Sequence, residues 1–215
     1  MQAKEKEKNR FTAEDYYNTP EGYPVELVNG RFIEKYTGRI IEDPLICAPG
    51  QNIRKTMPIK DMAAPSRAHQ EWVTILSRRI GNYIEDKGGS CRVYVSPFDV
   101  KLKENDDTVF QPDISVICDE KKLTDKGCIG APDWIIEVLS PGNASHDYIV
   151  KLNKYLDAGV REYWIVDPQN ETVNVCNLAS WNLDPAEYTF LDKIKAGIYE
   201  DLYLDFKEMS ERIRL

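Results

Sequence analysis

An acidic residue inside an otherwise apolar segment constrains this chain more than any other feature of its sequence. The segment Trp134–Leu139 has the sequence Trp-Ile-Ile-Glu-Val-Leu, a short apolar run that predicts a buried strand. An ionised Glu137 inside such a strand is costly unless it is paired with a cation or bound to one. Glu137 therefore lies either on the solvent face of a sheet or in a functional site.

The rest of the chain predicts more strands than helices. A helix begins after Ser66 and ends at Gly88-Gly89, a second spans about Asp147–Ala158 before Gly159, and a third spans Phe206–Ile213. The strands are predicted at Val25–Val28, Arg31–Glu34, Arg92–Val95, Phe98–Leu102, Asp113–Cys118, Trp134–Leu139, Arg161–Val166 and Thr172–Leu178. Asn29-Gly30 marks a two-residue hairpin turn, and another hairpin precedes the last helix. This order predicts a mixed-sheet α/β (α+β) fold, not a doubly wound parallel one.

The length of 215 residues suits one domain. We expect residues 1–10 to form a flexible tail and residues 11–215 to form a single domain. Residues 35–65 contain four prolines and lack a clear period, so they predict an irregular insertion or flap.

Composition excludes several classes of protein. The formal net charge of −8 argues against a broad phosphate-coating surface, although it leaves room for a local basic groove. No segment approaches the roughly 18 apolar residues of a membrane span, and the charged N-terminus does not resemble a secretory signal. We therefore expect a cytoplasmic protein that does not enter a membrane. Five cysteines without a CxxC pair and only two histidines argue against a structural zinc site and a disulfide scaffold.

The chemistry that remains rests on carboxylates. The motifs GxGxxG, GxxxxGK[ST] and GxSxG are absent from the sequence. Asp113 follows Pro112 at the start of a predicted strand, where it caps the strand entry or, together with Glu137, holds a divalent cation. Oxygen ligands alone suit Mg²⁺ or Mn²⁺.

The second helix places one lysine beside its buried face. At 100° per residue, Lys151 lies about 85° from the centre of the apolar stripe and Lys154 about 145° from it. Lys154 thus points to water, whereas Lys151 either lays its stem along the apolar edge or reaches a buried site. His69 shares the core-facing side of its helix, so it is either a half-buried structural histidine or a ligand-orienting one. Gln111 either lines the site or merely ends a strand.

Several strings of the sequence, taken in order, resemble a known family. They are Tyr-Pro-Val-Glu-Leu-Val-Asn-Gly (23–30), Pro-Ser-Arg-Ala-His (65–69), Gln-Pro-Asp (111–113), Glu-Val-Leu-Ser-Pro (137–141), Asp147 with Lys151 and Tyr155, and Ala-Gly-Val-Arg-Glu-Tyr-Trp-Ile-Val-Asp-Pro (158–168). From about Phe11 to Tyr203 the chain closely resembles the Uma-type family of restriction-endonuclease-like proteins, within the PD-(D/E)xK nuclease superfamily. The resemblance implies a restriction-endonuclease-like core with a metal site at the ends of two central strands.

The resemblance also assigns roles to individual residues. Asp113 resembles the acid of "PD" and Glu137 the acid of "(D/E)xK". The lysine position of that motif holds Leu139, so the motif is broken there, and Lys151 on the following helix is the residue that matches the family's lysine. Glu26 matches the acid of the family's "ELxxG" string and is expected to complete the metal shell. Residues 35–61 exceed the usual family spacing and could form a lid, a dimer arm or a separate loop.

The function implied is hydrolysis of DNA phosphodiester bonds by an endonuclease that depends on Mg²⁺ or Mn²⁺. Asp113, Glu137 and Glu26 would hold the metal, Lys151 would act on the water or the phosphate, and His69 and Gln111 could contact substrate or support the site. We expect a homodimer, since nucleases that cut both strands often pair two sites by two-fold symmetry. The alternatives are a non-catalytic DNA-binding or interaction module on the same fold and a hydrolase of another phosphodiester. The nuclease hypothesis predicts basic residues near one cleft.

Overall fold

The structure is a computed structural model that describes most of the chain. The described residues are 10–20, 23–35, 38–42, 44, 65–104, 107–140, 145–180 and 185–213, of which 145–148 are described in backbone only. The predicted tail, apart from Arg10, lies outside the described residues. Most of the predicted insertion at 35–65 lies outside them as well.

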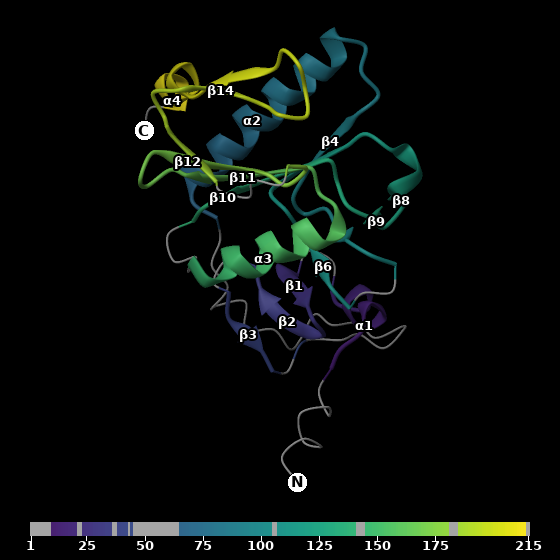
Figure 1. Cartoon of the computed structure of the whole chain (residues 1–215). Coiled ribbons are helices and arrows are strands. Elements are labelled where there is room, and N and C mark those ends of the chain that lie inside the picture. Colours follow the sequence, from purple (N-terminus) through teal and green to yellow (C-terminus); the bar gives the residue numbers. More distant parts are fainter. Residues whose placement is uncertain are drawn as a thin grey trace.

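In the described part of the chain, the strands form two mixed sheets and one small sheet (Figure 1). The seven-stranded sheet has the order β3 (Ile40–Ile41), β2 (Arg31–Glu34), β1 (Val25–Val28), β6 (Val109–Phe110), β5 (Val100–Lys101), β9 (Gly127–Ile129) and β8 (Leu123–Thr124). The six-stranded sheet has the order β13 (Ala186–Thr189), β12 (Thr172–Asn177), β11 (Glu162–Asp167), β10 (Trp134–Val138), β7 (Ile114–Ile117) and β4 (Arg92–Val95). The small sheet pairs β14 (Lys193–Lys195) with β15 (Tyr203–Asp205). The predicted mixed α+β fold is thereby confirmed.

Strand β10 lies at the centre of the six-stranded sheet and is buried along its whole length. It pairs in parallel with β11 and antiparallel with β7. Alternate residues of β10 face opposite sides, so Trp134 and Ile136 belong to one core cluster and Ile135 to another. By the same alternation Glu137 shares the side of Ile135.

Helices cover both faces of this sheet. Figure 1 shows α2 (Arg67–Asp86), α4 (Phe206–Ile213) and β14 on one side, and α3 (Ser145–Ala158) on the other, between the sheet and the β1–β2 hairpin. The short helix α1 (Ala13–Tyr17) and the 3-10 turn Glu120–Lys122 complete the helical elements of the described residues. Helix α3 therefore packs on the side of the sheet to which Glu137 belongs. In the part of the chain that the structure describes, no helix is long and apolar enough to cross a membrane.

Local sequence signals explain the ends of these elements. The Ser66 hydroxyl accepts a hydrogen bond from the His69 N–H at 3.2 Å and so caps α2. In the β1–β2 hairpin, Asn29 and Gly30 have φ values of 51° and 74°, which a type I′ turn requires. The predicted N-terminal and C-terminal hairpins are both present. Helix α3 begins two residues before its predicted start, at Ser145 instead of Asp147.

Three predictions need correction. The strand predicted at Phe98–Leu102 is shorter in the structure: β5 covers only Val100–Lys101, the two residues that pair with β6 and β9. The short strands β3, β6, β8, β9 and β13 were not predicted, because segments of two to four residues show no usable period. Lys154 does not point freely to water: it is half-buried, and its Nζ donates to the Thr108 hydroxyl at 3.4 Å.

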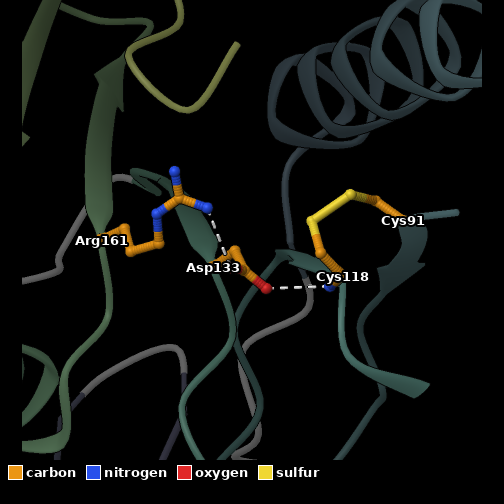
Figure 2. Close-up of a disulfide and its surroundings, with 4 residues drawn as sticks. All are labelled: Cys91, Cys118, Asp133 and Arg161. Carbon is orange, nitrogen blue, oxygen red and sulfur yellow. Dashed lines mark hydrogen bonds and ion pairs between the residues drawn. A yellow bond between two sulfur atoms is a disulfide. The ribbon is translucent and has the colours of Figure 1, made fainter. Parts of the chain in front are cut away.

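One disulfide is present, although the sequence argued against a disulfide scaffold. It joins Cys91 to Cys118, and Figure 2 shows it beside Asp133, whose carboxylate accepts the Cys118 N–H at 2.8 Å. Strands β4 and β7 are antiparallel neighbours with Arg92 opposite Ile117, so one further residue on each strand brings the two cysteines face to face. The number and spacing of the cysteines do not reveal the register of β4 against β7. Cys128 and Cys176 are buried free thiols, and Cys47 lies outside the described residues.

Candidate active site

The side chains singled out from the sequence come together between the two large sheets. Glu26 lies on β1, His69 in the first turn of α2, Asp113 just before β7, Glu137 on β10 and Lys151 on α3. Their exposed fractions are 1%, 3%, 3%, 7% and 6%. The interpretation that put Glu137 on the solvent face is therefore wrong, and so is the one that left Lys151 at the apolar edge of its helix.

Lys151 bridges two acids from different strands. Its Nζ lies 3.0 Å from Glu26 Oε2 and 3.0 Å from Glu137 Oε1. The Tyr155 hydroxyl donates to Glu137 Oε1 at 3.3 Å, and the Gln111 N–H donates to Glu26 Oε1 at 3.0 Å. Gln111 thus contacts the site through its backbone, a role that the sequence left open between lining the site and ending a strand. One helix therefore supplies both the cation and the hydroxyl that hold Glu137.

Asp113 has a separate set of partners. Its Oδ1 lies 2.9 Å from Lys35 Nζ, and its Oδ2 lies 3.1 Å from His69 Nε2. The Val138 N–H donates to Oδ2 at 2.9 Å. His69 is therefore hydrogen-bonded, as the interpretation as a structural histidine expected, but it is fully buried instead of half-buried. The bond from Val138 ties Asp113 to the strand that carries Glu137.

Lys35 is the site residue that the sequence analysis missed. It follows β2 directly, its side chain is only 4% exposed, and its Nζ also donates to the Ser96 hydroxyl at 2.6 Å. A signal did exist in the hairpin register. The Asn29-Gly30 turn pairs Glu26 with Ile33, and alternation then places Lys35 on the same face as Glu26.

The surroundings of Glu137 and Asp113 shift the pKa values of the two carboxyls in opposite directions. Burial raises the pKa of Glu137 to about 7, against the attraction of Lys151 and with added repulsion from Asp113 and Glu26. Burial also disfavours the charged form of Asp113, yet Lys35, His69 and the Val138 N–H outweigh it and hold the pKa of that carboxyl well below its usual range. Divergent pKa values in adjacent carboxyls are typical of acid–base sites.

Comparison with known proteins identifies the group to which this site belongs. A family model named Uma2, described as "Putative restriction endonuclease", matches residues 58–198. The chain belongs to the Uma2 family. Among solved structures, the fold is similar to that of a "putative nuclease belonging to DUF820" from Anabaena variabilis ATCC 29413, with a TM-score of 0.65 and 19% identity over 94% of this chain and 99% of that one. No curated protein matches the chain.

The Uma2 match confirms the resemblance drawn from the sequence motifs, and the solved structure confirms the predicted fold. The matched segment contains His69, Gln111, Asp113, Glu137 and Lys151. It is shorter than the span from Phe11 to Tyr203 over which the motifs were recognised, so Glu26 and Lys35 lie outside it. The β1–β2 hairpin nevertheless delivers both of these residues to the site.

A metal ion is the cofactor that a Uma2 site implies, and the donor types here suit one. Three carboxylates and one histidine lie together in a buried site, and a buried carboxylate is stabilised when it is paired with a cation or coordinates one. Carboxylate oxygens are the ligands that Mg²⁺ and Mn²⁺ prefer. Within the described residues, no three His, Cys, Asp or Glu side chains are grouped as metal ligands, because the lysines take up the carboxylate oxygens. The types of donor atom therefore fit a divalent cation, and the carboxylates are at present spaced by their ion pairs with Lys35 and Lys151.

Proposed function

We propose that this protein is a metal-dependent endonuclease that hydrolyses DNA phosphodiester bonds. The observation that carries the proposal is the contact of Lys151 with both Glu26 and Glu137, at 3.0 Å each, in a chain of a restriction-endonuclease family. Asp113, Glu137 and Glu26 are the residues that would hold Mg²⁺ or Mn²⁺. When bound, such an ion polarises a phosphate oxygen and activates water.

The other residues have roles that follow from their contacts. Lys151 presents an ammonium to the place where charge develops on the phosphate, an interaction that strengthens towards the transition state. Tyr155 holds Glu137 in place from the same helix. Lys35 and His69 fix the carboxylate of Asp113 and keep it ionised.

Among the described residues, few of the basic residues that the nuclease hypothesis predicts near one cleft lie at the proposed site. Lys35 and Lys151 lie in the site, and Lys154 lies one helical turn from it. Each phosphate neutralised adds to the salt dependence of DNA binding. We therefore expect weak binding without metal and a shallow dependence on salt.

The test is cleavage by the purified protein with Mg²⁺ or Mn²⁺ and with supercoiled, linear duplex and single-stranded DNA. We expect cleavage by the wild type and its loss in Asp113→Asn and in Glu137→Gln. Glu208→Gln, which changes an exposed acid on α4, should behave as wild type. Wild-type activity no greater than that of the Asp113→Asn/Glu137→Gln double variant would refute the proposal for those substrates.

Metal binding can be tested apart from cleavage. Calorimetric titration with Mn²⁺ should detect a site in the wild type that disappears in Glu137→Gln. DNA binding without such a site and without cleavage would favour the non-catalytic module instead.

Further expectations from the sequence stay predictions. A homodimer with two sites would suit an enzyme that cuts both strands, and sedimentation analysis checks it. A single domain over residues 11–215 should unfold in one cooperative transition. A cytoplasmic location is to be checked by cell fractionation.

A further inference from the structure

We propose that a cavity beside the carboxylates binds an unpaired nucleobase of the substrate strand. This inference rests on the proposed nuclease function and adds a base-binding subsite to it. The cavity has a volume of about 680 Å³ and lies between α1, the segment before β5 and the start of β9. Small-molecule sites commonly measure about 300–1,000 Å³. The space is therefore sufficient for a nucleobase with its sugar.

Aromatic rings make up much of the cavity wall. The rings are those of Tyr16, Tyr17, Tyr23, Tyr94 and Phe98. Tyr94 and Phe98 stack on each other, with centroids 4.1 Å apart and planes 10° from parallel. All of these side chains except Tyr16 are only half-buried. Lys126 Nζ lies 5.0 Å from the ring centre of Tyr17, and Tyr94 and Phe98 each cover one face of the other. Partly exposed aromatic rings are the groups on which proteins stack the bases of single strands.

The polar groups of the cavity suit a base better than a phosphate. Two carboxylates, Asp99 and Asp125, line it with a single ammonium group, Lys126. This balance disfavours a phosphate. Asp99 is held rigidly, because its Oδ1 accepts from the Tyr16 hydroxyl at 2.7 Å and from the Gln111 amide at 2.9 Å. A carboxylate fixed in this way can accept a hydrogen bond from the N–H groups on a base edge.

Gln111 joins the cavity to the proposed catalytic site. Its side chain lines the cavity, while its backbone N–H donates to Glu26 Oε1 at 3.0 Å. Asp113 lies only two residues further along the chain, about 7 Å away for extended backbone. This span is comparable with that from a phosphate to the base of the adjoining nucleotide.

A second, smaller cavity is lined in part by residues that lie next in sequence to residues of the first cavity. A cavity of about 150 Å³ is lined by Asp113, His69 and Ser96, whereas the next residue, Pro97, lines the larger cavity. In this proposal a strand with its phosphate near Asp113 runs past Pro97 and places a neighbouring base among the aromatic rings. A base inside a duplex is stacked and paired, so it must first be extruded or already be unpaired. The inference thus predicts a preference for single-stranded, mismatched or branched DNA.

The test measures binding in EDTA, where no metal-dependent cleavage occurs. The probes are hexathymidylate and an abasic hexamer that has the same phosphates and sugars but no bases. We expect the wild type to bind hexathymidylate at least about ten-fold more tightly, as base stacking on aromatic rings implies. Phe98→Leu and Tyr17→Leu keep apolar volume but remove a ring, and both should abolish most of this difference.

Two further variants separate the cavity from general effects. Tyr203→Leu changes an exposed ring on β15, outside the cavity, and should bind both probes as the wild type does. Asp99→Asn is nearly isosteric and should alter the preference among adenine, cytosine and thymine hexamers even if the ring variants fold poorly. Equal wild-type affinity for the two probes would overturn the inference, and so would a base preference unchanged in the ring variants and in Asp99→Asn.

The same experiments separate this inference from the nuclease proposal. Metal-dependent cleavage with no base-dependent binding refutes the subsite and leaves the nuclease intact. Base-dependent binding lost in the cavity variants, without cleavage by the wild type, supports the subsite and refutes the nuclease.

Discussion

Replacing Lys151 by methionine tests the central ion-pair network directly. The substitution keeps most of the apolar stem and removes an ammonium that lies 3.0 Å from each of two buried acids. Removal of one partner from a buried pair typically costs about 3–5 kcal/mol, because a charge is left without compensation. Glu137 can reduce this cost by taking up a proton, since its pKa is already raised to about 7.

The cost should therefore depend on pH. Burial raises the pKa of Glu137 in the folded state above its usual value, so protonation of this group favours folding. That contribution is complete below the unfolded pKa and disappears as the pH rises through the folded pKa of about 7. Loss of Lys151 raises the folded pKa further. The variant then differs most from the wild type above pH 7, by about 3 kcal/mol. The difference is smaller near pH 6, where Glu137 is mostly protonated in both proteins and Glu26 keeps the hydrogen bond from the Gln111 N–H.

The assay is urea unfolding in EDTA at pH 6 and pH 8.5, followed by the fluorescence of the buried Trp134 and Trp164. Lys207→Met on α4 is the matched control, because Lys207 is exposed and its loss should change stability by less than about 0.5 kcal/mol. We also expect Lys151→Met to lower metal-dependent cleavage by about 10²–10³-fold. A stability difference that is independent of pH, or no larger than that of the control, would refute the pairing of Lys151 with Glu137.

Three other variants probe different parts of the structure. Lys35→Met removes the cation that holds the pKa of Asp113 down, so it should cost about 3 kcal/mol near neutral pH and less as the pH falls through the range where Asp113 protonates, measured by urea unfolding. Glu162→Leu leaves the N–H groups of Trp164, Gly197 and Ile198 without their acceptor. It should lower the free energy of unfolding by about 2–4 kcal/mol, measured as a lower melting temperature. The folded variant should still cleave DNA. Cys91→Ser/Cys118→Ser removes a disulfide between residues 27 apart and should lower the free energy of unfolding by at most about 3.5 kcal/mol. Reduction of the wild type should lower its melting temperature to that of this variant.

The site could be predicted from the sequence wherever a residue was out of keeping with its neighbours. Glu137 stands among large apolar residues, and Asp113 follows a proline at a strand entry. The period of α3 placed Lys151 at the edge of the buried face, which is where a lysine has to lie to reach a site under the helix. Each of these signals is local, because it depends on fewer than twenty consecutive residues.

What the sequence did not reveal depends on pairing between distant segments. Lys35 follows a glutamate at the end of a hairpin strand, a composition typical of exposed positions. The hairpin pairs with β6 through β1, and Lys35 is buried in its contact with Asp113. The Cys91–Cys118 bond depends on the register of β4 against β7, and the short strand β9 depends on its pairing with β5. Strand register of this kind is set by tertiary packing, which a periodicity does not contain.

In the proposed nuclease, a lysine on a helix can serve the site because α3 lies on the side of the sheet that Glu137 faces. Residues 137 and 139 point to the same side of the sheet, and α3 is packed on that side (Figure 1). A lysine at position 139 would approach Glu137 along the strand, whereas Lys151 approaches it from the helix above and meets the same carboxylate. The helix position adds something that the strand position lacks: the ammonium also reaches Glu26 on the other sheet and lies 5.5 Å from the ring centre of Phe110. The lysine on α3 thus links both sheets at the point where the carboxylates meet, so its placement joins the chemistry of the site to the packing of the fold.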